Sequence, residues 1–268
     1  TEVMSDFGKL AQITERLEQA HVNFSVLARL IKDGSLAQLP ELRVNGRVII
    51  DSSQVYYYGI SNGGVQGLTF LALSPDVKRG ALTVPGGFWN VMMWRSANFA
   101  KLAQLLSASY PDPLDRQVLV AASQALWDYT DPATYAPHLL RDLLPGSATI
   151  PALGGKRVLY QEGIGDAQVP NLATRAMVRT MGLSLLQRPS EAVFGVGQVF
   201  GPVDSAYVQF DIGVMQRPGD TNVPPQENAV HEAIRRLEPA KLQLQKFLIE
   251  DGRVIDACLG VPCNLPAP

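Results

Sequence analysis

A serine in a glycine-bounded turn is the first residue whose type and spacing could do chemistry. Ser61 is the centre of Gly59-Ile60-Ser61-Asn62-Gly63, which follows an aromatic and β-branched run and precedes a helix-like one. Small residues around a serine permit a strained strand-to-helix turn that exposes the hydroxyl as a nucleophile. The backbone N–H of Asn62 would be the first donor to a developing oxyanion. The alternative is that the glycines only permit close packing and that Ser61 is an incidental small residue.

A nucleophilic serine needs a base, and the chain contains 3 histidines. His21 lies in the N-terminal helical segment, and His138 lies in a long segment between two predicted strands. His231 follows the last strand-like run, and it also follows a suitable acid in the order serine, acid, histidine. The sequence therefore predicts His231 as the base. The alternative is a helix-capping or surface histidine.

The third group is a carboxylate that holds the histidine ring from the far side and stabilises its charged form. Asp166 fits best, because it follows a strand-like run and lies in a turn shaped by Gly165 and Pro170. The competing acids are Glu162, Asp204, Asp211 and Asp220. Asp166 could instead be only an Asx-turn or helix-capping residue.

These candidate residues come after short apolar runs typical of buried strands. The runs cover residues 55–58, 79–84 and 157–161, and an alternating run covers 206–213. Helical spacing follows at residues 65–73, 173–186 and 231–249. Strands that alternate with helices predict an α/β fold with a largely parallel sheet.

The first 54 residues have a different pattern. Apolar residues at helical spacing over 5–32 predict one or two helices, which Asp33-Gly34 ends. Asn45-Gly46 within residues 42–50 is the strongest short hairpin signal in the chain. This part of the sequence supplies at most one hairpin to a sheet.

Residues 88–156 separate two of the predicted strands and are too long for an ordinary crossover. Their helical periodicity predicts a helical cap insertion, so that 1–87 and 157–268 form the α/β core. The insertion begins with a cluster of large apolar side chains, of which Trp89, Met92, Met93 and Trp94 are candidates for lining an acyl pocket. The equally simple alternative is that they form plain helical core.

Composition excludes several classes of function. A net charge of −2 with thinly spread Lys and Arg argues against nucleic-acid binding. No apolar run approaches the roughly 18 residues that cross a bilayer, so no membrane span is predicted. The chain starts at Thr1 without a basic-then-apolar leader, so a leader was removed or none existed. Cys258 and Cys263 fit no zinc pattern; they predict either a local disulfide, and hence export, or two free thiols.

Taken together, these motifs resemble the α/β-hydrolase superfamily. The resemblance rests on Tyr58–Gly64, on Gly163–Pro170 and on Asn228–Glu232, in this order along the chain. More narrowly, the chain is similar to bacterial, often exported, esterases or lipase-like hydrolases with a helical insertion. The resemblance implies an α/β-hydrolase-like sheet, Ser61 as nucleophile, His231 as general base and acid, Asp166 as orienting carboxylate, an acyl-enzyme, and no metal or organic cofactor.

One departure from the superfamily concerns the strands before the strand-to-helix turn of Ser61, which is called the elbow below. Several strands and a loop with the second oxyanion donor come first in that superfamily, whereas 60 residues precede Ser61 here and many read as helix. The second donor therefore has no assignment. The elbow strand is expected close to a sheet edge, where a second copy of the chain, the N-terminal segment or an upstream polypeptide would cover it. A two-fold dimer is the favoured solution.

The leading functional hypothesis is a carboxylic ester hydrolase for small to medium acyl groups. An amidase or peptidase with the same triad is one alternative, because the sequence does not distinguish the leaving group. A catalytically weak remnant of the fold, kept as a binding or scaffold protein, is the other. The expected location is periplasmic or secreted, and the cytoplasm is the alternative.

Overall fold

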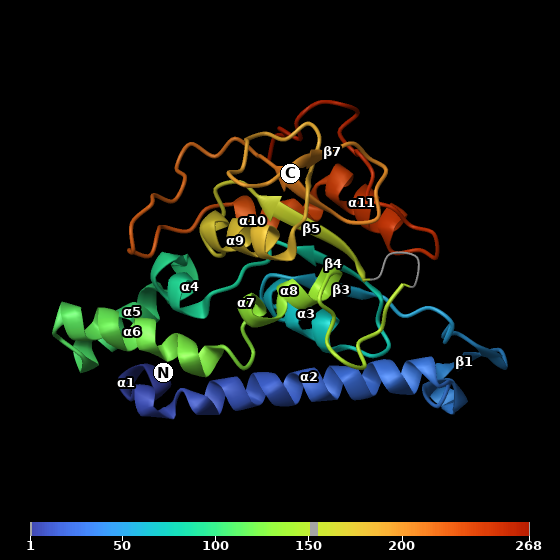
Figure 1. Cartoon of the computed structure of the whole chain (residues 1–268), viewed down its shortest axis with the longest axis horizontal. Helices are drawn as coiled ribbons and strands as arrows, with labels where there is room; N and C mark the ends of the chain where they lie inside the picture. The colour runs from blue at the N-terminus through green and yellow to red at the C-terminus, as the bar shows by residue number, and fades with distance from the viewer. Residues whose placement is uncertain (1, 151–154, 268) are drawn as a thin grey trace.

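A parallel six-stranded sheet forms the centre of the computed structural model, which describes residues 2–150 and 155–267 (Figure 1). The strand order is β3-β4-β5-β8-β6-β7, and every neighbouring pair is parallel. The strands are β3 (Tyr57–Ile60), β4 (Arg79–Thr83), β5 (Arg157–Gly163), β6 (Leu185–Leu186), β7 (Gln198–Val199) and β8 (Ala206–Phe210). The predicted α/β class with a largely parallel sheet is confirmed.

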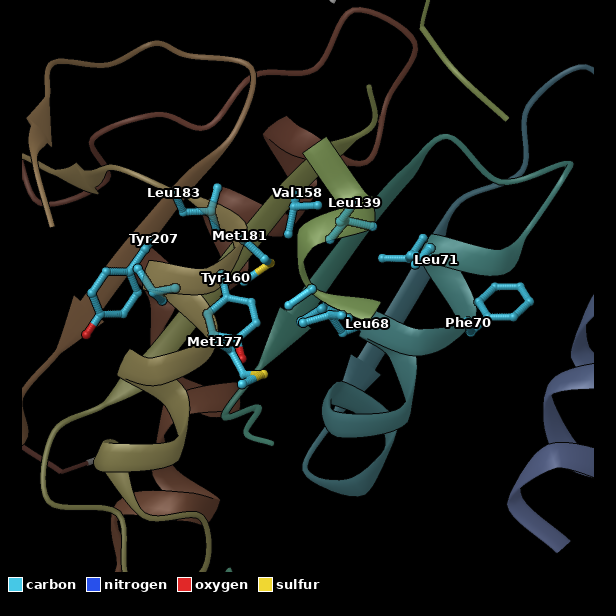
Figure 2. Close-up of a cluster of buried hydrophobic side chains, with 14 of the residues drawn as sticks. Leu68, Phe70, Leu71, Leu139, Val158, Tyr160, Met177, Met181, Leu183 and Tyr207 are labelled. Carbon is cyan, nitrogen blue, oxygen red and sulfur yellow. The ribbon is translucent and has the colours of Figure 1, made fainter. Parts of the chain in front are cut away.

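One face of the sheet packs against the helix that follows the elbow. Side chains of α3 (Asn62–Leu73) and α9 (Asn171–Met181) meet Val158 and Tyr160 of β5 and Tyr207 of β8 in one buried cluster (Figure 2). The short helices α7 (Pro132–Tyr135) and α8 (Pro137–Leu140) add to this face. Burial of this apolar surface holds α3, and with it the elbow, against the sheet.

The opposite face packs against the last helices of the chain. Val208 and Phe210 of β8 meet the buried side chains of α10 (Val230–Ala233), η5 (Ile234–Arg236) and α11 (Glu238–Phe247). A single helix over 231–249 was predicted, and that prediction was wrong. Leu237 has extended φ and ψ of −64° and 130°, and a new helix begins at Glu238 with Pro239 in its first turn, where a proline is well tolerated.

The helix predicted over 173–186 also ends earlier than expected. α9 ends at Met181, because Gly182 adopts φ 73° and caps the helix. Leu185 and Leu186 then form β6, a short strand that the sequence analysis missed. Its two residues are fully apolar, so periodicity alone does not separate this strand from a helix end.

The long segment between β4 and β5 contains several helices up to Leu140. α4 (Trp89–Arg95), η4 (Ala97–Phe99), α5 (Ala100–Ser109) and α6 (Pro113–Trp127) form a cluster with α1 (Glu2–Ser5) and η1 (Phe7–Lys9). The N-terminus therefore packs with these helices, and Figure 1 shows them beside the sheet. Residues 151–154 of the predicted insertion 88–156, together with residues 1 and 268, lie outside the described residues.

The predicted helix and hairpin near the N-terminus are confirmed. The 22-residue helix α2 (Ala11–Lys32) ends at Asp33 and Gly34, and runs alongside α3 (Figure 1). After η2 (Leu36–Gln38) and η3 (Pro40–Leu42), β1 (Arg43–Val44) pairs with β2 (Arg47–Val48). Asn45 and Gly46 have φ of 50° and 76° at the turn, as a two-residue hairpin of this type requires.

The elbow strand lies at one end of the sheet. β3 pairs with β4 on one side, and no strand among the described residues pairs with its other side. Tyr58 on this strand is 41% exposed. The expected edge position is therefore present, and the backbone groups along this edge are open to a further strand.

Two further features concern the C-terminus and membranes. Cys258 and Cys263 form a disulfide, which is the first of the two alternatives that the sequence left open. In the part of the chain that the structure describes, none of the helices combines the length and the apolar character that crossing a bilayer requires.

Lys156, which precedes β5, is a buried lysine with 2% exposure. Its Nζ donates to the carbonyl of Ser74 at 2.8 Å and to that of Leu71, at the C-terminal end of α3. Burial lowers the pKa of Lys156 from 10.5 to about 7, against an opposing effect of Asp76. Between these two pH values the unfolded chain binds more protons than the folded one, so stability rises with pH.

We expect Lys156→Met to remove this rise. Between pH 7 and pH 9 the free energy of unfolding of the wild type should gain about 2 kcal/mol relative to that of the variant. Urea unfolding at several pH values measures the difference. Lys78→Met, at an exposed lysine, is the control and should keep the wild-type dependence. An identical pH profile for Lys156→Met and the wild type would contradict the prediction.

Candidate active site

Ser61 occupies a strained turn between β3 and α3. Its φ of 57° and ψ of −124° lie in a region that side-chain-bearing residues rarely adopt, and it precedes the first residue of α3. Such a conformation costs about 1–3 kcal/mol and persists only where the surrounding structure imposes it. Here the Ser61 N–H donates to the carbonyl of Thr83 at 3.0 Å, and the Ser61 carbonyl accepts from Val65 at 2.9 Å. The strand and the helix therefore hold the turn from both sides.

The glycines of the turn differ in how much space a side chain would have. A Cβ at Gly59 would lie 2.1 Å from the carbonyl oxygen of Gly63, so no side chain fits. A Cβ at Gly63 would meet no atom closer than Tyr57 Oη at 3.9 Å, so a side chain would have room at this second position. Gly64 is the crowded one instead, with the carbonyl oxygen of Thr83 3.0 Å from its Cβ position.

Asp166 and His231 form a buried pair. His231 Nδ1 lies 2.7 Å from Asp166 Oδ2, and the two side chains are 3% and 2% exposed. The other carboxylate oxygen of Asp166 accepts from the N–H groups of Gln168 at 2.8 Å and Val169 at 3.0 Å. These backbone bonds orient the carboxylate, and the carboxylate orients the imidazole ring.

The competing acids and histidines have other partners. Glu162, Asp204 and Asp211 each pair with an arginine, and Asp220 is exposed. His21 Nε2 lies 2.8 Å from Gln66 Oε1, and burial lowers the pKa of His21. His138 lies beside Asp142 near the surface. Among the three histidines, His231 is the one whose partner follows a strand of the sheet.

The second ring nitrogen of His231 is available to a proton donor. Nε2 is buried and has no hydrogen-bond partner among the described residues. Because Nδ1 faces a carboxylate, the proton of the neutral ring belongs on Nδ1, and Nε2 carries a free lone pair. A buried acceptor without a partner lowers the stability of the fold by about 1–3 kcal/mol, so its presence needs an explanation. Accepting a proton from a substrate or a neighbouring hydroxyl would be one.

Ser61, Asp166 and His231 lie at the same edge of the sheet. They follow β3, β5 and β8, whose carboxyl ends point in one direction because the strands are parallel. No hydrogen bond joins the Ser61 hydroxyl to His231 Nε2 in the described structure. Catalytic hydrogen bonds are often long or poorly aligned when no substrate is bound.

The backbone N–H of Asn62 is the first of α3 and has no acceptor within that helix. It lies next to the candidate nucleophile at the positive end of the helix dipole, where a negative oxygen is stabilised. None of the hydrogen bonds around Ser61 identifies a second donor, so that position stays unassigned.

The predicted pocket residues pack into cores. Met93 is 4% exposed and belongs to the cluster of α1, α5 and α6, where Trp94 packs against it. Trp89 stacks on Trp127 with ring centroids 5.2 Å apart. Met92 is 3% exposed and meets Val65 of α3. Met92 is thus in contact with the helix that starts at the elbow, whereas a role in holding an acyl group stays a prediction.

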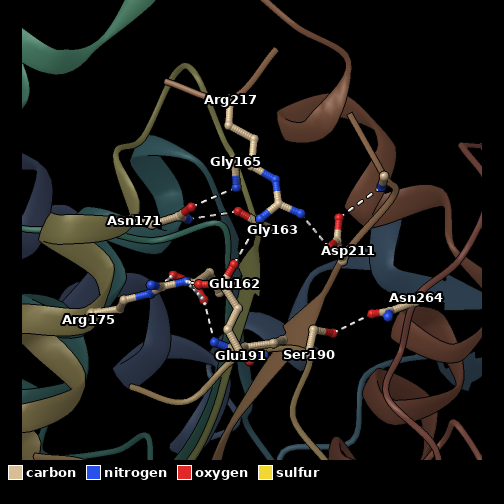
Figure 3. Close-up of polar contacts among 12 residues, drawn as sticks. Glu162, Gly163, Gly165, Asn171, Arg175, Ser190, Glu191, Asp211, Arg217 and Asn264 are labelled. Carbon is tan, nitrogen blue, oxygen red and sulfur yellow. Dashed lines mark hydrogen bonds and ion pairs between the residues drawn. The ribbon is translucent and has the colours of Figure 1, made fainter. Parts of the chain in front are cut away.

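Two asparagines that the sequence analysis passed over hold the turn before Asp166. Asn171 accepts from the Gly165 N–H at 2.7 Å and donates to the Gly163 carbonyl at 2.8 Å (Figure 3). Asn228 donates to the Gly165 carbonyl at 2.8 Å, and its Oδ1 accepts from Val230 at the start of α10. Asn228 therefore joins the turn of residues 163–166, here called the acid turn, to the helix of His231. An Asx residue close to a glycine turn is the signal that points to such a role.

An ion cluster lies behind the acid turn. Glu162 on β5 binds Arg175 at 2.9 Å, and Arg175 also binds Glu191 at 2.9 Å (Figure 3). Burial raises the pKa of the Glu162 carboxyl, against the effect of Arg175. Tyr207 and Gln209 on β8 donate to the same carboxylate. The cluster ties β5 to α9 and β8, and so supports the strand that carries Asp166.

The described residues contain no group of three or more His, Cys, Asp or Glu side chains arranged to hold a metal ion. In comparisons with models of protein families, with curated proteins and with solved structures, nothing matched the chain. Support for a function therefore comes from the residues of this chain and their geometry.

We expect Asn171→Ala to lower the free energy of unfolding by about 1–3 kcal/mol, because Gly165 and Gly163 would lose a hydrogen-bond partner inside the fold. Asn98→Ala removes an exposed amide that bonds only to Gln168 and serves as the control. Urea unfolding with unchanged m-values measures both. Equal stability of the two variants would show that the asparagine does not hold the acid turn.

Proposed function

We propose that this chain is a serine hydrolase that cleaves carboxylic esters of small to medium acyl groups. The observation that carries the proposal is the buried Asp166–His231 pair with a free Nε2, at the same sheet edge as the strained turn of Ser61. This arrangement supports Ser61 as nucleophile, His231 as base and Asp166 as the carboxylate that orients it. The resemblance of the three motifs to the α/β-hydrolase superfamily supports it further.

In the proposed reaction, His231 Nε2 takes the proton of the Ser61 hydroxyl while Oγ attacks the ester carbonyl carbon. The carbonyl π electrons move to oxygen, and the Asn62 N–H stabilises the resulting negative charge. Collapse of this intermediate expels the alcohol, which receives its proton from the imidazolium, and leaves an acyl group on Ser61. A water molecule, deprotonated by the same nitrogen, then releases the acid and restores the serine.

Two alternatives follow from the same geometry. An amidase or peptidase would use the same three residues. A catalytically weak binding protein is the second alternative; it fits the unassigned second oxyanion donor and the absence of a Ser61–His231 hydrogen bond in the described structure. Covalent labelling by a fluorophosphonate distinguishes the hydrolases from the binding protein, because only an activated serine reacts.

Ser61→Ala should abolish ester hydrolysis and fluorophosphonate labelling, and His231→Ala should reduce activity as much without adding to it, because the residues act as a unit. Losses of about a million-fold are known for such triads, and Asp166→Asn should cost less. Release of p-nitrophenol from p-nitrophenyl butyrate measures the effect. Ser109→Ala, at an exposed serine, and His138→Ala are controls that should keep wild-type rates. A Ser61→Ala variant with near wild-type turnover would exclude the triad.

We further propose that a second copy of the chain covers the open edge of β3; an upstream polypeptide is the alternative. The support is the unpaired strand edge and a helix α2 that leaves several apolar side chains exposed, namely Val22, Phe24, Val26, Leu27 and Leu30. A two-fold dimer is the commonest symmetric solution. The disulfide supports a periplasmic or secreted location over the cytoplasm.

If the edge of β3 pairs with a second copy, Tyr58→Lys should shift the protein toward the monomer, because a charge on an edge strand opposes strand pairing. Val118→Lys, at an exposed position of α6, should leave the mass unchanged. Light scattering coupled to size exclusion at micromolar concentration measures both. A wild type of single-chain mass would contradict self-association.

A further inference from the structure

A cavity of about 360 Å³ opens beside the candidate active site. Its walls include the turn of Asp166, residues at the start of α9, Arg95 at the end of α4, and the loop 217–225. The volume lies in the range of pockets that hold small organic groups. The proposed function uses only one residue of this lining, Asp166.

Four arginines line the cavity: Arg95, Arg175, Arg179 and Arg217. Two of them are already neutralised, since Arg175 pairs with Glu162 and Glu191, and Arg217 pairs with Glu191 and Asp211. The network holds these two guanidinium groups in place (Figure 3). In this wall two guanidinium groups face three carboxylates, so the network adds no net positive charge to the cavity.

The other two arginines retain their positive charge. Arg95 donates to neutral acceptors, the side-chain oxygen of Asn222 at 2.9 Å and the carbonyl of Asp220 at 3.0 Å. Arg179 makes no ion pair within the described part of the chain and lies two turns into α9. Of the carboxylates in the lining, Asp166 and Glu191 are engaged in pairs, and Asp220 is exposed.

We propose that this cavity binds an anionic oxyacid group, carboxylate or phosphate, at the far end of the substrate, so that the protein is an esterase for negatively charged esters. The inference rests on the proposed function. Guanidinium groups suit planar carboxylates and phosphates, to which they donate two parallel hydrogen bonds. The positive end of the α9 dipole, whose first residues line the same cavity, adds to the attraction.

The test compares substrates of equal chain length that differ only at the far end. Monomethyl adipate carries a carboxylate, methyl 5-phosphonopentanoate a phosphonate, and methyl hexanoate a methyl group. We expect kcat/KM to be higher for one or both anionic esters than for the neutral one, and the ratio between the two anions identifies the preferred oxyacid. Equal or lower values for both anionic esters would overturn the inference while leaving ester hydrolysis itself intact.

Substitutions assign the effect to the cavity. Arg179→Gln and Arg95→Gln should each lower kcat/KM for the anionic ester by about tenfold, as loss of a hydrogen bond to a charged group implies. Neither should change the rate on methyl hexanoate. Asp220→Asn should raise the preference for the anion, and Arg43→Gln, at an exposed residue of β1, is the matched control. A loss on neutral and anionic esters alike would show damage to the fold rather than to recognition.

Binding can be measured without turnover. The Ser61→Ala variant should bind monomethyl adipate in isothermal titration calorimetry, and Arg179→Gln in the same background should weaken binding by about tenfold. Binding that depends on Arg179 in a protein that hydrolyses no ester would sustain the anion site and refute the proposed function. No detectable binding at millimolar concentration would overturn the anion site.

Discussion

The common direction of β3, β5 and β8 is the constraint on which the candidate site depends. Parallel strands end at one edge of a sheet, so residues that follow them along the chain are brought together although they are 65 or more positions apart in sequence. The burial of both sheet faces fixes that direction, through α3 and α9 on one side and α10 and α11 on the other. The position of the Asp166–His231 pair follows from this packing.

Polar contacts then fix the position of the segment around Asp166 more closely than the sheet does. The backbone bonds to Asp166, the two asparagines around Gly165 and the buried Glu162–Arg175 pair all act on the same short segment. A charged pair inside a protein is stable only when its remaining hydrogen bonds are made. The segment that carries the candidate acid is therefore held by several hydrogen bonds, whereas His231 Nε2 has no partner among the described residues.

Two further features concern the cavity at the carboxyl ends of the strands and the lateral edge of the sheet at β3. Arginines from α4, α9 and the loop before α10 converge on a cavity beside Asp166, and the strand that carries Ser61 has an unpaired side. Both features lie next to the proposed reaction centre. The cavity bears on which substrate the candidate triad would accept. The unpaired side of β3 bears on which chain would cover it.

Local features of this protein were determined by the sequence alone. The Asn45-Gly46 hairpin and the stop at Asp33-Gly34 depend on residues a few positions apart, because φ and ψ preferences act over that range. The end of α9 at Gly182 and the start of α11 at Glu238, next to Pro239, are local as well, although the sequence analysis did not use them.

Tertiary structure decided what depends on distant residues. The sequence favoured Asp166 but left its competitors open, and only the strand order places Asp166 against His231 while Glu162, Asp204 and Asp211 meet arginines. Met93 and Trp89 read equally as pocket or core, and the packing of α1 with the helices after β4 buries Met93 and partly buries Trp89. The physical reason is that burial and ion pairing are settled by which elements pack together, and such contacts join residues whose separation in sequence carries no signal.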